Sequence, residues 1–153
     1  MDTIDKKILH QLQTDSTRPI TDIADQVGIS STPCWRRIQK LEKDGVITRR
    51  VAILDRKALN LAITVFVMIK TGNHSAEWLE DFSSHIESID EVAEFYRMSG
   101  TVDYLIKISV PDIEAFDTVY KRIIKIDGLQ DVSSSFAMEE IKFSTALPLH
   151  YSR

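Results

Sequence analysis

Residues 20–45 constrain the fold most, because their apolar spacing and turn signals predict two short helices joined by a tight turn. The first helix is expected to end at Gly28, since a glycine just after the last apolar position often closes a helix in the left-handed conformation. Ser30 or Thr32 can cap the second helix, and Pro33 fits its first turn, where a missing N–H costs little. The stretch therefore predicts a helix-turn-helix.

The second of these helices has an apolar face and a polar face. Cys34, Ile38 and Leu41 share the apolar face. The polar side and its flanks supply the candidate DNA contacts, which are Ser31, Thr32, Trp35, Arg36, Gln39, Lys40 and Lys43. Arginine can read guanine, glutamine can read adenine, and lysine neutralises phosphate, so this helix is expected to enter a major groove. Two alternatives stay open: the basic face is only solvated, or Trp35 seals the domain core instead of resting on the DNA backbone.

The net charge of −4 is unevenly distributed along the chain. Residues 1–50 carry nine Lys/Arg against seven Asp/Glu, whereas residues 51–153 carry ten against sixteen. The basic first third is therefore the part suited to phosphate, and the acidic remainder is not expected to touch DNA.

The elements around the two helices complete a small DNA-binding domain. Residues 3–14 predict a preceding helix capped by Asp2 or Thr3. Residues 46–55 are rich in β-branched residues and predict one or two short strands, the wing of a winged helix-turn-helix. Arg49 and Arg50 are candidate phosphate contacts in this wing. The domain is expected to span residues 1–50.

A connector over residues 51–61 is followed by a second domain over 62–153. Alternating and helical patterns predict strand, helix, strand, strand, helix and one or two final strands, over 62–71, 75–89, 92–100, 103–110, 113–125 and 132–149. This order is the βαββαβ arrangement of a ferredoxin-like αβ-sandwich, so the fold class is α+β. Alternate residues of the first and last strands are apolar on both sides, and the helices can cover only one face. Self-association through the free face is therefore expected.

The remaining composition narrows the class of protein. No apolar run approaches the roughly 20 residues of a membrane helix, and the N-terminus shows no signal segment, so a cytoplasmic protein without a membrane partner is expected. A Gly-rich phosphate loop and a GxSxG motif are both missing from the sequence, which argues against an enzyme.

No cofactor is expected. His74 and His85 can share a helix face as an alternative metal site. Cys34 is interpreted as a core residue, with a sensing thiol as the alternative.

Four blocks resemble the leucine-responsive/asparagine-responsive (Lrp/AsnC, feast/famine) transcriptional regulators. They are DTIDKKILHQLQTDSTR, TPCWRRIQKLEKDGVI, SGTVDYLIKI and SSFAMEEIKFSTALPL, in the family's order and spacing. The resemblance implies a winged helix-turn-helix on double-stranded DNA and a sandwich that dimerises through its sheet. It also implies octamers or similar assemblies, and small amino-acid effectors bound at contacts between dimers. The connector departs from the family pattern, because Arg56 stands where proline is common.

The resemblance also suggests an effector site at the turn from Gly100 to Asp103. A glycine turn exposes N–H groups that can hold an α-carboxylate, and an aspartate can pair with an α-ammonium. The candidate residues are Met98, Ser99, Gly100, Thr101, Asp103, Tyr104, Ser135 and Phe136. The alternative is a plain β-hairpin in which Asp103 makes a turn bond.

The sequence therefore predicts a DNA-binding transcriptional regulator that answers to an amino acid and acts as a dimer or octamer. Two alternatives remain open. One is a nucleoid-type architectural protein with weak sequence preference, and the other is an amino-acid-binding module without site-specific regulation.

Overall fold

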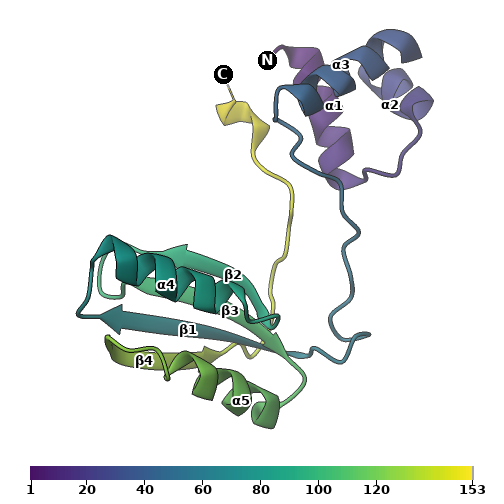
Figure 1. Ribbon diagram of the computed structural model, residues 1–153. Coiled ribbons are helices and arrows are strands. Elements are labelled where there is room, and N and C mark those ends of the chain that lie inside the picture. The colour runs from purple at the N-terminus through teal and green to yellow at the C-terminus, as the bar shows by residue number, and fades with distance from the viewer. Residues whose placement is uncertain (153) are drawn as a thin grey trace. The chain divides into compact units, whose positions relative to one another are not determined.

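The computed structural model describes residues 1–152 as two compact units (Figure 1). The helical unit comprises Met1–Ile53 and the segment from Ile141 onward, and the sheet unit comprises Leu54–Glu140. No helix among the described residues has the length and apolar character needed to cross a membrane.

Three helices form the helical unit, as expected: α1 (Thr3–Thr14), α2 (Ile20–Val27) and α3 (Ser31–Lys43). Asp2 caps α1 in a reciprocal capping box with Asp5, which satisfies two backbone N–H groups at the helix start. Gly28 closes α2 with φ 78°, the left-handed conformation predicted for it. The apolar faces of the three helices meet in one core of buried residues, which are Ile8, Leu9, Leu12, Ile23, Ala24, Val27, Cys34, Ile38 and Leu41.

The predicted wing strands are absent, because the described residues 46–55 have no regular secondary structure. The backbone N–H groups of Val46 and Ile47 instead donate to the carbonyl oxygen of Leu41, at 2.9 and 3.1 Å, and so finish the end of α3. A strand needs a neighbouring strand for its hydrogen bonds, and residues 48–55 have none within residues 1–152.

The sheet unit has the predicted βαββαβ order. Its elements are β1 (Ile63–Thr71), α4 (Ala76–Glu87), β2 (Val92–Arg97), β3 (Tyr104–Val110), α5 (Ile113–Ile123) and β4 (Leu129–Phe136). The strands pair antiparallel in the order β2-β3-β1-β4. One face of the sheet packs on both helices, around Val65, Ile106 and Phe82, and forms the second core. The ferredoxin-like fold is confirmed.

The other sheet face is half-buried and mixed in character. Phe66 lies opposite Lys107, and Met68 lies opposite Leu105, so these four side chains share that face. Lys107 donates to Glu94 at 2.7 Å, which places one ion pair among the apolar groups. The face therefore carries apolar surface on β1 and β3, together with a charged pair that the alternation did not reveal. The prediction of a second apolar side is wrong for the last strand, because Ser133 and Ser135 of β4 lie opposite Met68 and Phe66 on this face.

The chain after β4 departs from the prediction of strands over 132–149. β4 ends at Phe136, and residues 137–148 have no regular structure before a short 3₁₀ turn, η1 (Leu149–Tyr151). The structure groups the residues from Ile141 onward with the helical unit, whereas the sequence assigned all of 62–153 to the sandwich. Leu149 packs against the helical core, which explains the difference.

Candidate DNA-binding and effector sites

The outward face of α3 is the candidate DNA-binding surface. Its predicted contacts are all exposed: Ser31, Thr32, Trp35, Arg36, Gln39, Lys40 and Lys43. They project from the flanks of α3 and from the side opposite the buried Cys34, Ile38 and Leu41, so core packing fixes which side chains face outward. Trp35 is 49% exposed and lies outside the core, so the interpretation that it seals the domain is wrong.

The adjacent Arg36 and Arg37 have different environments. Arg37 Nη1 lies 2.6 Å from an Asp2 carboxylate oxygen and 2.7 Å from one of Asp5, so it ties α3 to the start of α1. The hydrogen bonds to Asp5 and Asp2 raise the pKa of Arg37, and hydrogen bonds from the Asp5 backbone N–H and from Arg37 lower the pKa of Asp2. Arg36 is exposed and forms no ion pair with any described residue. The pairing of Arg37, which the sequence did not suggest, leaves Arg36 as the arginine available for a base.

The other cations of this surface are partly engaged. Lys40 pairs with Asp44 at 2.6 Å, and the hydrogen bond raises the pKa of the lysine. Arg50 pairs with Glu42 at 2.8 Å. Arg49 is exposed, and the described chain supplies it with no ion-pair partner. Exposed pairs of this kind stabilise the free protein little, so they can exchange for phosphate contacts.

Burial raises the pKa of the Cys34 thiol above its ordinary value. The thiol is fully buried in the helical core and stays protonated, which argues against the sensing alternative. The metal alternative at His74 and His85 also gains no support, since the described residues include no group of three His, Cys, Asp or Glu side chains able to hold an ion.

The turn from Gly100 to Asp103 links β2 to β3 and is held from both sides. The Met98 N–H donates to the Asp103 carbonyl at 2.8 Å, and the Asp103 N–H donates to the Ile69 carbonyl at 2.9 Å. One Asp103 carboxylate oxygen accepts from the Thr71 N–H at 2.9 Å. Gly100 has φ 121°, a conformation that favours glycine, and its surroundings are open. Asp103 therefore already has a structural hydrogen bond, and its second oxygen is left for another partner.

The structure brings together only part of the predicted effector set. Met98, Ser99 and Thr101 are exposed beside Gly100 and Asp103. Tyr104 is 3% exposed, because its ring packs among Trp78, Phe82 and Phe95. It is a core residue of the described chain and does not line an open site there.

Ser135 and Phe136 lie near the other end of the sheet. Tyr104 pairs with Ile69 of β1, whereas Phe136 pairs with Val65, four residues earlier on the same strand. At roughly 3.3 Å per residue, that is a separation of about 13 Å along the strand. One chain therefore does not place Ser135 and Phe136 beside the Gly100 turn.

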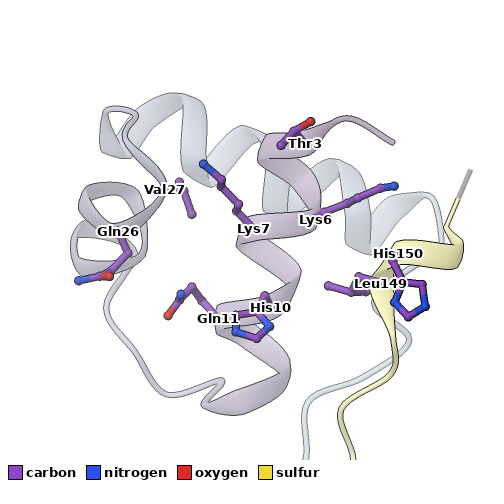
Figure 2. A pocket seen from close by; sticks show the side chains of 9 residues that line it. All are labelled: Thr3, Lys6, Lys7, His10, Gln11, Gln26, Val27, Leu149 and His150. Atoms are coloured by element: carbon purple, nitrogen blue, oxygen red, sulfur yellow. The ribbon is translucent and has the colours of Figure 1, made fainter.

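A further groove of about 450 Å³ lies outside the predicted sites. Figure 2 shows Lys6 of α1 on the side of Leu149 and His150 of the C-terminal turn, whereas Lys7 extends toward Val27 of α2. Sequence reasoning missed this arrangement, because no local pattern signals that the chain's last residues pack on its first helix.

Comparison with known families agrees with the two-part architecture. Residues 1–48 match the family model of a winged helix-turn-helix DNA-binding domain, and residues 64–147 match that of the Lrp/AsnC ligand binding domain. The chain belongs to the Lrp/AsnC family.

Relatives of this Lrp/AsnC chain are transcriptional regulators. The DNA-binding transcriptional activator DecR of Escherichia coli is 44% identical over 150 residues, which cover 97% of this chain and 99% of DecR. The glutamate uptake regulatory protein of Zymomonas mobilis is 46% identical over 149 residues, covering 97% of this chain and 91% of the relative. These matches, which cover nearly the whole of each relative, identify the chain as a DNA-binding transcriptional regulator.

Solved structures of the Lrp/AsnC family have the same fold. An AsnC family transcriptional regulator from Agrobacterium tumefaciens is 57% identical with a TM-score of 0.96, and the match covers all of both chains. A transcriptional regulator of Neisseria meningitidis, in complex with L-methionine, is 31% identical with a TM-score of 0.92 over 97% of each chain.

Proposed function

We propose that this regulator reads DNA with α3 and that an amino acid bound by the sheet unit changes its DNA affinity. The observation that carries the first part is the division of α3 into a buried apolar face and an exposed basic face, on which Arg36 forms no ion pair with a described residue. A rigid helix of this kind can present arginine to guanine bidentately.

The contacts divide by chemistry into two groups. Arg36 and Gln39 are the proposed base-reading residues, since both side chains can make paired hydrogen bonds to base edges. Lys40, Lys43, Arg49 and Arg50 are the proposed phosphate contacts, with Ser31, Thr32 and Trp35 beside them on the helix flank. Phosphate contacts supply affinity without sequence preference, whereas base contacts supply the preference that distinguishes a regulator from an architectural protein.

For the effector, we propose the Gly100 turn. Its glycine exposes backbone to solvent, and the carboxylate of Asp103 has an oxygen that forms no bond within the described chain. The relative bound to L-methionine supports the choice of ligand class, because a free amino acid offers one carboxylate and one ammonium. Met98, Ser99 and Thr101 complete the near side.

A complete pocket needs a second copy under this proposal. Tyr104 is buried and Phe136 lies about 13 Å along the strand, so one chain presents an open half-site. We therefore propose that chains dimerise through the sheet face bearing Phe66, Met68 and Leu105, and that further association, such as an octamer, brings other copies to the turn. We also place the protein in the cytoplasm, where the chromosomes of its bacterial relatives lie.

The test is a DNA-binding titration of the full chain in the presence of each of the twenty amino acids. A site-specific regulator retains its cognate duplex against excess random DNA, and one or more amino acids shift its affinity. If excess competitor DNA of any sequence displaces the cognate duplex, the result would favour the architectural alternative. An amino acid that binds in calorimetry but leaves DNA affinity unchanged would favour the simple binding module.

A further inference from the structure

The chain passes between its two units twice, which gives the helical unit two covalent connections. The first is the connector, residues 51–61, and the second is the C-terminal segment, residues 137–152. A unit held by one flexible linker reorients widely, and a second linker restricts it most when the ends of that linker are fixed to the two units. The contacts of the C-terminal segment therefore decide whether it acts as a tether.

The far end of the C-terminal segment is fixed to α1. The side-chain amide of Gln13 donates to the Leu147 carbonyl at 3.1 Å and accepts from the Leu147 N–H at 2.9 Å. Lys6 donates to the Ser152 carbonyl at 2.8 Å. Leu149 packs against the helical core between these polar contacts, beside His10 in Figure 2. An apolar anchor flanked by three hydrogen bonds makes this end a built part of the helical unit.

The near end of the same segment is fixed to the sheet unit. Phe136 packs edge-on against Phe116, with ring centroids 5.1 Å apart, and the next N–H, from Ala137, donates to the Thr64 carbonyl at 2.9 Å. Glu140 then pairs with Arg56 at 2.6 Å.

Arg56 belongs to the other connection, so this ion pair joins the two linkers. Its second guanidinium nitrogen donates to the Thr64 hydroxyl at 2.5 Å, which holds the arginine against β1. The connector and the C-terminal segment are thus clamped together where they leave the sheet unit. The clamp uses an arginine that is two-thirds buried, so it is better shielded than an ordinary surface pair.

We propose that the C-terminal segment is a second tether of the helical unit, closed at its base by the Arg56–Glu140 clamp. The segment starts directly after β4, so a displacement of β4 reaches α1 through twelve residues, 137–148, rather than through the connector alone. Its regulatory consequence, transmission of the effector signal to the DNA-binding helices, rests on the proposed amino-acid response.

The clamp is tested by charge reversal in the full chain. Arg56→Glu and Glu140→Arg each place like charges together, whereas the double variant restores an opposite pair. The control is Lys121→Glu, which removes the exposed pair with Asp117 on α5 and touches neither linker. The fluorescence anisotropy decay of Trp35 measures reorientation of the helical unit. It is recorded in a Trp78→Phe background, which removes the second tryptophan and keeps an aromatic ring against Phe82.

The expected result is a larger nanosecond component of the decay in both single variants, with wild-type behaviour in the double variant and in Lys121→Glu. A decay that is identical in the wild type and all four variants would overturn the clamp. The contact of the C-terminal segment with α1 has its own test. Gln13→Ala should speed hydrogen exchange of the Leu147 amide about fivefold, because that amide loses one neutral hydrogen bond, whereas Gln26→Ala should leave the exchange unchanged. Unchanged exchange in Gln13→Ala would overturn the docking.

The signalling consequence has a separate readout. The fold-change in DNA affinity caused by the amino acid should shrink in Arg56→Glu and return in the double variant. An unchanged response in Arg56→Glu would overturn transmission through the tether. A wild-type chain that responds to no amino acid would overturn the proposed function instead, and the anisotropy decay would still decide the tether.

Discussion

At the scale of single residues, the structure separates side chains that hold the fold from side chains that are free to bind. Arg37 pairs with Asp2 and Asp5, whereas Arg36 is exposed and has no ion-pair partner in the part of the chain that the structure describes. Asp103 is intermediate, because one carboxylate oxygen accepts from Thr71 and the other is left for a ligand. Substitutions at these positions therefore give different and specific outcomes.

Arg36→Ala is expected to cost roughly 1–3 kcal/mol of DNA-binding free energy on the cognate duplex and to relax specificity at one base pair. Arg49→Ala should instead weaken binding to all sequences alike and lower the salt-dependence slope by about one. Fluorescence titrations on cognate and random duplexes at several salt concentrations distinguish the two. Equal losses for Arg36→Ala on both duplexes would contradict base reading.

Asp103→Asn should lower effector affinity by about ten- to a hundredfold, since a charge-assisted hydrogen bond contributes roughly 1.5–3 kcal/mol. The asparagine carbonyl can still accept from the Thr71 N–H, so the turn and the free energy of unfolding should change little. Calorimetry with the effector and a thermal melt together make the measurement. Identical affinities would remove Asp103 from the site, and a large drop in melting temperature would indicate a mainly structural role.

At the scale of elements, the open sheet face combines apolar residues with a charged cluster on β2 and β3. Glu94 accepts from Lys107 and from the Tyr96 hydroxyl, each at 2.7 Å. The hydrogen bonds from Lys107 and Tyr96 hold the pKa of Glu94 below its ordinary value of 4.5, and the same contact raises the pKa of Tyr96. The stability that this cluster gives to the pairing of β2 and β3 therefore depends on pH.

A carboxylate whose pKa is lowered by folding stabilises the folded state above its unfolded pKa and loses that contribution as pH falls through its folded pKa. The free energy of unfolding should accordingly decrease below about pH 4.5 in wild type. Glu94→Gln should flatten this part of the profile. Urea melts between pH 6 and roughly pH 3 test the prediction, and parallel profiles for the two proteins would show that Glu94 does not contribute.

At the scale of the whole molecule, the boundary between the units differs from the boundary in sequence. The last residues complete the first domain, so the sheet unit alone is Leu54–Glu140. We predict that the fragment 54–140 dimerises at micromolar concentration without the DNA-binding helices, because its open face carries Phe66, Met68 and Leu105. Light scattering is the measurement, with Met68→Lys as the variant expected to weaken the dimer. A stable wild-type monomer would locate the interface elsewhere.

The sequence by itself determined the elements and their faces. Local periodicity was sufficient for α1, α2, α3 and the βαββαβ order, because each element must bury one apolar stripe whatever its neighbours are. Periodicity also predicted that Arg36 is exposed on α3. The turns at Gly28 and Gly100 were predictable for a different reason, because a glycine with positive φ reflects the local backbone conformation alone.

Only the tertiary structure decided the contacts between segments far apart in the chain. Leu149 on the helical core and Arg56 beside Glu140 each join residues separated by more than eighty positions, and no periodic pattern records such a meeting. The predicted wing strands failed for the related reason that a strand depends on a partner, which residues 46–55 lack in the described chain. Tyr104 follows the Gly100–Asp103 turn, and the family resemblance made it an effector candidate, yet packing among three aromatic rings makes it a core residue. Local propensity determines helices and turns, whereas long-range packing determines which ends of the chain are held together.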